Sequence, residues 1–139
     1  SVVYHTYRQV HETGAMKLFK SHRPDIEHGH QSRDFIYVMD AVRVLHFLME
    51  KQPNSGLYNL GTGEARSFLD LATQTFLAMD LEPRISFIDT PEDIRDTYQY
   101  YTCADMSKLR EAGYSEPFTT LEEGVSDYVR TYLTSTLIY

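Results

Sequence analysis

Short apolar segments with the pattern of β-strands alternate with amphipathic helices along the sequence, and this order limits the possible folds most. We predict strands over residues 16–19, 34–38, 57–60 and 85–88, with helices between or after them. Strands that alternate with helices usually pair in parallel, so the order predicts an α/β fold. About four short strands are few for a sheet that helices cover on both faces. We therefore expect an incomplete α/β architecture.

Other residue patterns mark where the helices begin and end. Gly14 should end a helix over residues 1–12, and Asp40 should precede a second helix. Two pairs have the pattern of a capping box at a helix start: Ser67 with Asp70, and Thr120 with Glu123. The second helix carries apolar residues at the spacing of a buried face, namely Val42, Leu45, Leu48 and Met49. We expect this face to lie in the core.

The composition is that of an ordinary globular domain with an acidic surface. Of the 139 residues, 42% are hydrophobic and 24% are charged, and 13 Lys and Arg against 20 Asp and Glu give a net charge of −7. Such a chain has no overall positive field to attract nucleic acid or anionic lipid, and no apolar run approaches the roughly 18 residues of a membrane span. Cys103 is the only cysteine, which excludes an internal disulfide and favours a reducing compartment. We expect neither nucleic-acid nor membrane partners.

Three segments carry a recognisable combination of motifs. The first is Arg-Asp-Phe-Ile-Tyr-Val-Met-Asp at residues 33–40, and the second is Tyr-Asn-Leu-Gly-Thr-Gly at residues 58–63. The third, over residues 93–114, contains a Tyr-Gln pair, an Ala-Asp pair and a Leu-Arg-Glu-Ala-Gly-Tyr run. Together they resemble the extended short-chain dehydrogenases that epimerise or dehydrate nucleotide sugars. The third segment is similar to the branch of this family that epimerises ADP-heptose.

The resemblance implies a fold, a substrate and a cofactor. Residues 1–139 would form the C-terminal, substrate-binding portion of such an enzyme, with an incomplete Rossmann-type architecture, and the N-terminal dinucleotide-binding region would be absent. The parent enzyme would bind an ADP-sugar and NADP, oxidise a hydroxyl of the heptose and return the hydride to the other face. It would act in the cytoplasm, in the supply of heptose for bacterial lipopolysaccharide.

The residues that carry out the chemistry in this family are not found in the sequence. A dinucleotide-binding turn needs three spaced glycines, and the turn at residues 61–63 has no third glycine at the required spacing. The family's catalytic pair is a Tyr with a Lys four residues later, and none of the eleven tyrosines is followed in this way. We therefore predict no catalytic and no cofactor-binding residue here, and we expect NADP to bind the parent enzyme rather than this chain alone.

Six residues match family positions that contact the substrate. The resemblance implies that Arg33 binds the diphosphate, which its planar guanidinium can contact through two parallel hydrogen bonds. Tyr98 would contact the nucleotide or the sugar through its hydroxyl and its ring. The other four are His5 on the first helix and the consecutive residues Phe19, Lys20 and Ser21, which would line the sugar-nucleotide pocket. Alternatively, Arg33 is an exposed arginine that pairs with Asp34, and Tyr98 is a packing residue.

Other groups of reactive residues have a simpler explanation. Three histidines and two acidic residues lie between Ser21 and Ser32, but their spacing matches no closed zinc site, so we interpret them as a solvated loop and predict no metal. The carboxylates between Asp89 and Asp96 could form an acid–base pair, although an exposed acidic loop explains them better. Cys103 has no evident basic partner, and we interpret it as inert.

Two other functions stay open. The chain could come from another nucleotide-sugar enzyme, such as a UDP-hexose 4-epimerase or a dehydratase. It could also be a non-catalytic module that binds a nucleotide sugar. A surface that met an absent half would be exposed in a fragment, so we expect the chain to form homo-oligomers.

Overall fold

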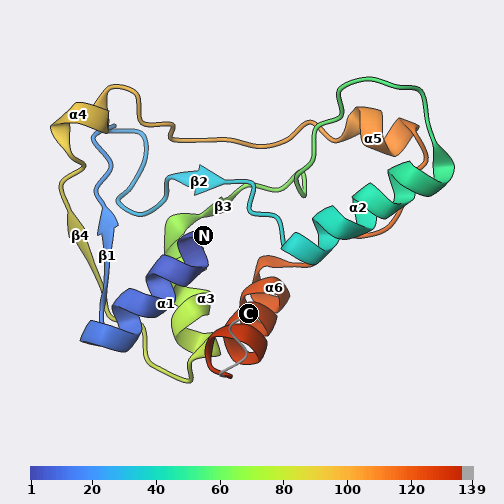
Figure 1. The fold of residues 1–139 in the computed structure, drawn as a ribbon. Coiled ribbons are helices and arrows are strands. Elements are labelled where there is room, and N and C mark those ends of the chain that lie inside the picture. Colours follow the sequence, from blue (N-terminus) through green and yellow to red (C-terminus); the bar gives the residue numbers. More distant parts are fainter. Residues whose placement is uncertain (136–139) are drawn as a thin grey trace.

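The computed structural model describes residues 1–135, which form a main part and an arm (Figure 1). The main part contains the strands and the helices α1 (Val2–Thr13), α3 (Phe68–Ala78) and α6 (Leu121–Asp127). The arm consists of α2 (Val38–Lys51), the segment up to residue 60 and α5 (Ser107–Glu111), on the right of the view. Strands and helices are combined as predicted. Among residues 1–135, none of the helices has the length and apolar content that a bilayer crossing requires.

Two pairs of short strands make up the sheet structure. β1 (Met16–Phe19) pairs in parallel with β4 (Ile85–Ile88), as the alternation of strands and helices predicts. β2 (Ser32–Arg33) pairs antiparallel with β3 (Arg66–Ser67). The short helix α4 (Glu92–Arg95) follows β4. The strands predicted over residues 16–19 and 85–88 are therefore confirmed.

The helices of the main part begin and end where their sequence signals predict. α1 ends at Gly14, whose φ of 72° lies in the left-handed region that glycine adopts without a Cβ clash. Both capping boxes are present, because the side chains of Ser67 and Thr120 accept hydrogen bonds from the backbone N–H groups of Asp70 and Glu123. These local signals fix the starts of α3 and α6.

Apolar side chains of α3 and of the C-terminal helices hold the main part together. Ala72 and Phe76 of α3 are fully buried. Ala78 packs with Val125 of α6 and with Val129 of η1 (Tyr128–Leu133), a π-helical turn that continues α6. α1 also lies against α3 and η1. Fully burying a large apolar side chain contributes about 1.5–3 kcal/mol, so this helix layer is a main source of stability.

The arm has a smaller core of its own. Val44 of α2 packs with Met106, Leu109 and Tyr114, which lie in and around α5. The ring of Phe47 meets the ring of Tyr114 edge to face, with 5.3 Å between the centroids. This cluster holds α2 and α5 together through one side of α2.

Two strands predicted from the sequence are not formed. Residues 34–37 are an extended loop and Val38 already begins α2, because the side chains of this loop are held by tertiary contacts rather than by a strand partner. The ring of Phe35, for example, packs edge to face on Phe68 at 5.5 Å. Residues 57–60 are not a strand either, and within the described residues their backbone groups make no backbone–backbone hydrogen bond. A strand needs a neighbouring strand, and neither segment has one here.

The prediction that one apolar face of α2 lies in the core is confirmed for Leu48, which packs against the cluster around Val44, and is wrong for the other three residues. Val42, Leu45 and Met49 are exposed to 49%, 56% and 74%. The helix instead turns Asp40 and Val44 inward, and both are buried. An apolar strip therefore faces outward along the arm.

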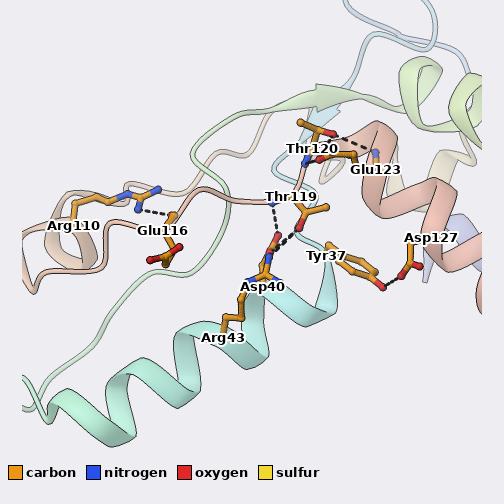
Figure 2. A network of polar contacts seen from close by, with 9 residues as sticks. All are labelled: Tyr37, Asp40, Arg43, Arg110, Glu116, Thr119, Thr120, Glu123 and Asp127. Atoms are coloured by element: carbon orange, nitrogen blue, oxygen red, sulfur yellow. Dashed lines mark hydrogen bonds and ion pairs between the residues drawn. The ribbon is translucent and has the colours of Figure 1, made fainter.

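A polar network joins the arm to the main part (Figure 2). The buried carboxylate of Asp40 accepts hydrogen bonds from the backbone N–H and the hydroxyl of Thr119, both at 2.9 Å, and it pairs with Arg43. Next to it, the hydroxyl of Tyr37 donates to the carboxylate of Asp127 on α6. Burial and the nearby carboxylate raise the pKa of Tyr37, so its hydroxyl remains a donor at neutral pH. The start of α2 is thereby fixed to α6.

Candidate functional site

Arg33 lies at the end of β2, and its guanidinium is close to two aromatic rings. Its two terminal nitrogens donate to the backbone carbonyls of Ser32, at 2.9 Å, and of Gln99. The guanidinium carbon is 5.6 Å from the ring centroid of Phe68 and 5.7 Å from that of Tyr98. Both distances allow a cation–π interaction. The structure therefore holds this cation in one place, and its bonds go to carbonyls rather than to the carboxylate of Asp34.

Aromatic rings extend this cluster toward β1. The ring of Phe19 meets that of Tyr98 edge to face at 6.2 Å, and Tyr98 meets Tyr100 at 5.4 Å. Burial raises the pKa of Tyr98, and the nearby positive charge of Arg33 offsets this only in part. The hydroxyl of Tyr98 is therefore protonated at neutral pH and can donate a hydrogen bond. Three of the six predicted residues, Phe19, Arg33 and Tyr98, come together here.

Lys20 and Ser21 follow Phe19 directly, but their side chains are engaged elsewhere. The ammonium group of Lys20 lies 3.0 Å from the carboxylate of Asp89, in an ion pair near the surface. The hydroxyl of Ser21 donates to the Arg23 carbonyl and accepts from the Arg23 N–H, both at 3.1 Å, and the residue is buried. Lys20 can exchange its partner for a ligand, whereas the hydroxyl of Ser21 is used within its own turn.

His5 lies outside this cluster. It is exposed on α1, where its ring is 5.8 Å from that of Tyr4. Within residues 1–135, no hydrogen bond or ring contact joins His5 to Phe19, Arg33 or Tyr98. The six predicted positions thus form one cluster, two neighbouring positions and one separate residue, and their role in binding stays a prediction.

Histidines of the loop over residues 21–31 organise the surroundings of the cluster. The Nδ1 atom of His28 accepts from the backbone N–H of Ser21 at 3.1 Å, and Nε2 of His22 accepts from that of Thr90 at 3.2 Å. The backbone N–H of His22 donates to the hydroxyl of Tyr100 at 3.0 Å. In the part of the chain that the structure describes, no three His, Cys, Asp or Glu side chains are arranged to hold a metal ion. These histidines therefore position the loop.

Two residues of this region, Phe68 and Gln31, were not predicted from the sequence. Phe68 forms one wall of the Arg33 site, but an aromatic residue at a helix start looks like an ordinary core residue. Gln31 is buried, and its amide nitrogen donates to the Phe19 carbonyl at 3.2 Å while its oxygen has no partner among the described residues. A buried polar residue between two irregular segments leaves no periodic signal in the sequence.

The turn at residues 61–63 does not have the free donors that a dinucleotide phosphate requires. The carboxylate of Asp34 accepts hydrogen bonds from the Thr62 N–H (2.7 Å) and hydroxyl (2.6 Å), and from the N–H groups of Gly63 (2.9 Å) and Ala104 (3.0 Å). Burial alone would raise the pKa of Asp34, but these hydrogen bonds outweigh it and lower the pKa. A Cβ at Gly61 would lie 2.7 Å from that of Ala104, so the turn also needs glycine there. The donors of this turn are already bound to an internal anion, and the residues do not fit a nicotinamide dinucleotide.

A cavity of about 540 Å³ lies next to the Arg33 cluster, with Asp34 and Phe35 in its walls. It opens between the start of α1, residues 34–38 and α6, and its walls are mainly apolar. Neither Arg33 nor Tyr98 lines it. The cavity and the Arg33 cluster are therefore distinct features, and we place the candidate site at the cluster because it brings three of the six predicted residues together around a fixed cation. Arg110 is a second arginine that lies over two aromatic rings, those of Tyr114 and Phe118, but it is not among the predicted residues.

The sequence is similar to known enzymes over nearly its whole length. Residues 1–61 match the sequence model of the NAD dependent epimerase/dehydratase family. The chain is 46% identical over 139 residues to the ADP-L-glycero-D-manno-heptose-6-epimerase of Fusobacterium nucleatum and 50% identical over 133 residues to that of Nitratidesulfovibrio vulgaris. Each match covers 96% of this chain but only 42% and 41% of the two relatives. The chain thus spans about two-fifths of the curated relatives it matches.

Solved structures share the fold. The ADP-L-glycero-D-manno-heptose-6-epimerase of Helicobacter pylori matches with a TM-score of 0.73 at 25% identity, over 93% of this chain and 36% of that one. A dTDP-glucose 4,6-dehydratase of Bacillus anthracis, solved in complex with NAD, matches with a TM-score of 0.75 at 15% identity, over 97% of this chain and 40% of that one. These findings confirm the predicted resemblance to nucleotide-sugar epimerases and the predicted fold class.

Proposed function

We propose, because nearly the whole chain is similar to part of the nucleotide-sugar epimerases, that residues 1–139 are the C-terminal, substrate-binding portion of an NADP-dependent ADP-glyceromanno-heptose 6-epimerase. In this proposal, the portion of the enzyme that this chain does not match binds the cofactor and supplies the catalytic residues. The nicotinamide cofactor, when bound there, takes up and returns the hydride. The residues described below bind and orient the nucleotide part of the substrate.

The position of Arg33 beside the rings of Phe68 and Tyr98 is the observation that carries this proposal. Two carbonyl oxygens each accept a hydrogen bond from one terminal nitrogen of Arg33 and fix the plane of the guanidinium. The remaining N–H groups can donate to phosphate oxygens, with the planar geometry that suits a diphosphate. The rings of Phe68 and Tyr98 lie against the guanidinium and help to hold it in place. A fixed cation beside such rings supports the binding of a nucleoside diphosphate.

Lys20 and Tyr98 support the same site. Lys20 is partly exposed, and its pair with Asp89 is a surface ion pair, which typically contributes about 0–1 kcal/mol. A phosphate that approaches the cluster can therefore replace Asp89 at little cost. The protonated hydroxyl of Tyr98 can donate to a sugar or phosphate oxygen. Together with Arg33, these groups supply positive charge and hydrogen-bond donors without a metal.

The remaining parts of the proposal concern the cellular role. By its similarity to the ADP-heptose epimerases, the parent enzyme supplies heptose for bacterial lipopolysaccharide in the cytoplasm. NADP is the proposed form of its cofactor, and a homo-oligomer is its proposed state. The solved relative with bound NAD supports a nicotinamide cofactor in general.

Titration calorimetry with ADP and UDP tests the site directly. We expect the chain to bind ADP more tightly than UDP. Arg33→Ala removes charge-assisted hydrogen bonds of about 1.5–3 kcal/mol and should weaken ADP binding about 10- to 100-fold. Arg8→Ala, which removes an exposed arginine on α1, serves as the matched control and should leave binding unchanged. Tighter binding of UDP would favour a UDP-hexose 4-epimerase or a related dehydratase, and an Arg33→Ala variant that binds like the parent chain would refute this site.

A further inference from the structure

Gln31 is the largest polar side chain among the buried residues, with 1% of its surface exposed. Its amide nitrogen donates to the carbonyl oxygen of Phe19 at 3.2 Å, and this contact fixes the orientation of the amide because a carbonyl can only accept. The amide oxygen is buried as well, and it has no hydrogen-bond partner among the described residues. A buried acceptor without a partner lowers stability, and an apolar side chain of the same length would avoid this loss. Stability alone therefore does not account for a glutamine at this position.

The amide of Gln31 holds the end of β1. Phe19 is the last residue of that strand, and its ring meets the ring of Tyr98 edge to face at 6.2 Å. The strand pairing itself does not depend on Gln31, because β1 pairs with β4 along its whole length and the N–H of Lys20 donates to the carbonyl of Ile88 at 2.8 Å. The amide therefore sets where Phe19 lies relative to the Arg33 cluster.

The backbone around Gln31 fixes the other side of the cluster. The carbonyl of Gln31 accepts from the N–H of Phe68, at the start of α3, at 3.0 Å. The next N–H, that of Ser32, donates to the carbonyl of Tyr100 at 2.9 Å, and β2 lies beside β3 (Figure 1). Gln31 thus contacts β1 through its side chain and α3 through its backbone.

These bonds complete a closed chain of contacts around the candidate site. The ring of Phe19 meets that of Tyr98, and the guanidinium of Arg33 lies close to the rings of Tyr98 and Phe68. Gln31 joins Phe68 back to Phe19 through two hydrogen bonds. Because Gln31 is fully buried, it cannot touch a bound nucleotide. Any effect of its side chain on binding must therefore pass through its neighbours.

We infer that Gln31 is a positioning residue of the nucleotide site: its amide holds the ring of Phe19 against Tyr98 and thereby keeps Tyr98 beside Arg33. This inference rests on the proposed function, in which Arg33 and Tyr98 bind a nucleoside diphosphate. It also explains the unpaired oxygen, since the side chain is needed for its donor and not for its acceptor.

Gln31→Met tests this role. Methionine has nearly the same length, so it fills the same space and removes both the donor and the unpaired oxygen. Titration calorimetry should show that ADP binding to the chain is weakened about 3- to 10-fold, the effect of one neutral hydrogen bond. The urea midpoint of unfolding should stay within about 0.5 M of that of the parent chain, because the lost hydrogen bond and the removed unpaired oxygen offset each other.

Thr75→Val is the matched control. Thr75 is also fully buried, and its hydroxyl donates to the carbonyl of Leu71 at 2.8 Å, so valine removes a buried hydrogen bond that no residue of the cluster shares. ADP binding by this variant should stay within about twofold of the parent chain. Gln31→Met is then repeated in the Phe19→Ala background. There it should weaken ADP binding by less than about a further twofold, because the ring that the amide holds is gone.

Nuclear magnetic resonance of the free chain gives a readout that does not require ADP. The ring protons of Tyr98 are identified in ring-labelled tyrosine by their loss in Tyr98→Phe. Their signals should shift in Gln31→Met and stay in place in Thr75→Val, because in the first variant alone the neighbouring ring of Phe19 changes its position.

The outcomes separate this inference from the proposed function. If the parent chain binds no ADP but the Tyr98 signals shift in Gln31→Met, the proposed function fails and the positioning of Tyr98 by Gln31 stands. Unchanged Tyr98 signals overturn the inference in either case, and so does a Gln31→Met variant that binds ADP as tightly as the parent chain. An effect on ADP binding that persists in full in the Phe19→Ala background would show a merely structural role and would also overturn it.

Discussion

The main part and the arm receive the same kind of sequence signal and use it differently. On α3, apolar spacing turns Ala72 and Phe76 into a core shared with α1 and α6. On α2, a similar apolar spacing leaves Leu45 and Met49 exposed. Amphipathic spacing alone therefore does not establish that a helix face is buried within the same chain.

The strands repeat this contrast. β1 finds a parallel partner in β4, although the two are far apart in the sequence. Residues 57–60 have a strand pattern as well, but no neighbouring strand lies beside them in the described chain. The exposed apolar face of α2 and the unpaired segment over residues 57–60 both lie on the arm, whereas Leu71, Ala72 and Phe76 of α3 are buried in the main part.

The largest expected effect comes from the core of the main part. Phe76→Ala removes a fully buried ring from α3, and the resulting cavity should lower the free energy of unfolding by about 3–5 kcal/mol. Urea denaturation followed by circular dichroism measures this loss. A loss below about 1 kcal/mol would mean that α3 is not the centre of the core, and the contrast with the arm would disappear.

A smaller loss is expected where the arm meets the main part. Asp40→Ala leaves the N–H and the hydroxyl of Thr119 without their acceptor and should cost about 2–3 kcal/mol. Hydrogen exchange should accelerate in α2 more than in α3, because the contact fixes the arm. Glu50→Ala removes an exposed carboxylate from the same helix and should change the unfolding free energy by less than about 0.5 kcal/mol. Equal acceleration in both helices would show that the two parts unfold as one unit.

Local signals explain which features were predictable from the sequence. Gly14 and the capping boxes of Ser67 and Thr120 act within a few residues, so their roles can be inferred without the fold. The strand predicted over residues 57–60 is not formed, because strand formation depends on a pairing partner that lies elsewhere in the sequence and that local signals do not reveal. Arg33 and Tyr98 were found through a family resemblance, and spacing alone would not have joined them.

The Asp34 contact could not be predicted from its neighbours. An acidic residue beside Arg33 suggests an ion pair, yet its carboxylate binds the turn at residues 61–63 and the backbone of Ala104 instead. Such a contact links three segments that are distant in the sequence, and only the fold brings them together. The same holds for Phe68, whose ring reaches Arg33 because β3 pairs with β2.

Asp34→Asn tests the contact between Asp34 and the turn at residues 61–63. Its expected effect on the free energy of unfolding is smaller than that of Asp40→Ala. The variant replaces an ionised acceptor by an amide that supplies only one acceptor oxygen, so we expect a loss of about 1–2 kcal/mol in unfolding free energy at pH 7. The pKa of Asp34 is lowered in the folded chain, so its charge stabilises the fold above the unfolded pKa of about 3.9. This stabilisation is lost as the pH falls through the lower, folded pKa.

The difference between Asp34→Asn and the parent chain should therefore narrow below about pH 4, which urea denaturation at pH 7 and pH 3 measures. Asp93→Asn, in the exposed helix α4, controls for the general loss of a negative charge. A difference that stays constant with pH would show that the geometry of the side chain matters rather than its charge.

The smallest effect is expected on the α2 strip, the exposed row of Val38, Val42, Leu45 and Met49, and it gives the sharpest test of the comparison. Met49→Lys changes a residue that is 74% exposed into another good helix former, so the unfolding free energy should change by less than about 0.5 kcal/mol. The loss of unfolding free energy on removing the ring of Phe76 should be several times larger, because that ring is fully buried against side chains of the same chain. If Met49→Lys destabilises the chain by more than about 1 kcal/mol, the strip is already covered in the isolated protein. Unfolding at two protein concentrations then identifies the cover, since a strip buried between copies makes the midpoint rise with concentration, whereas burial within one chain does not.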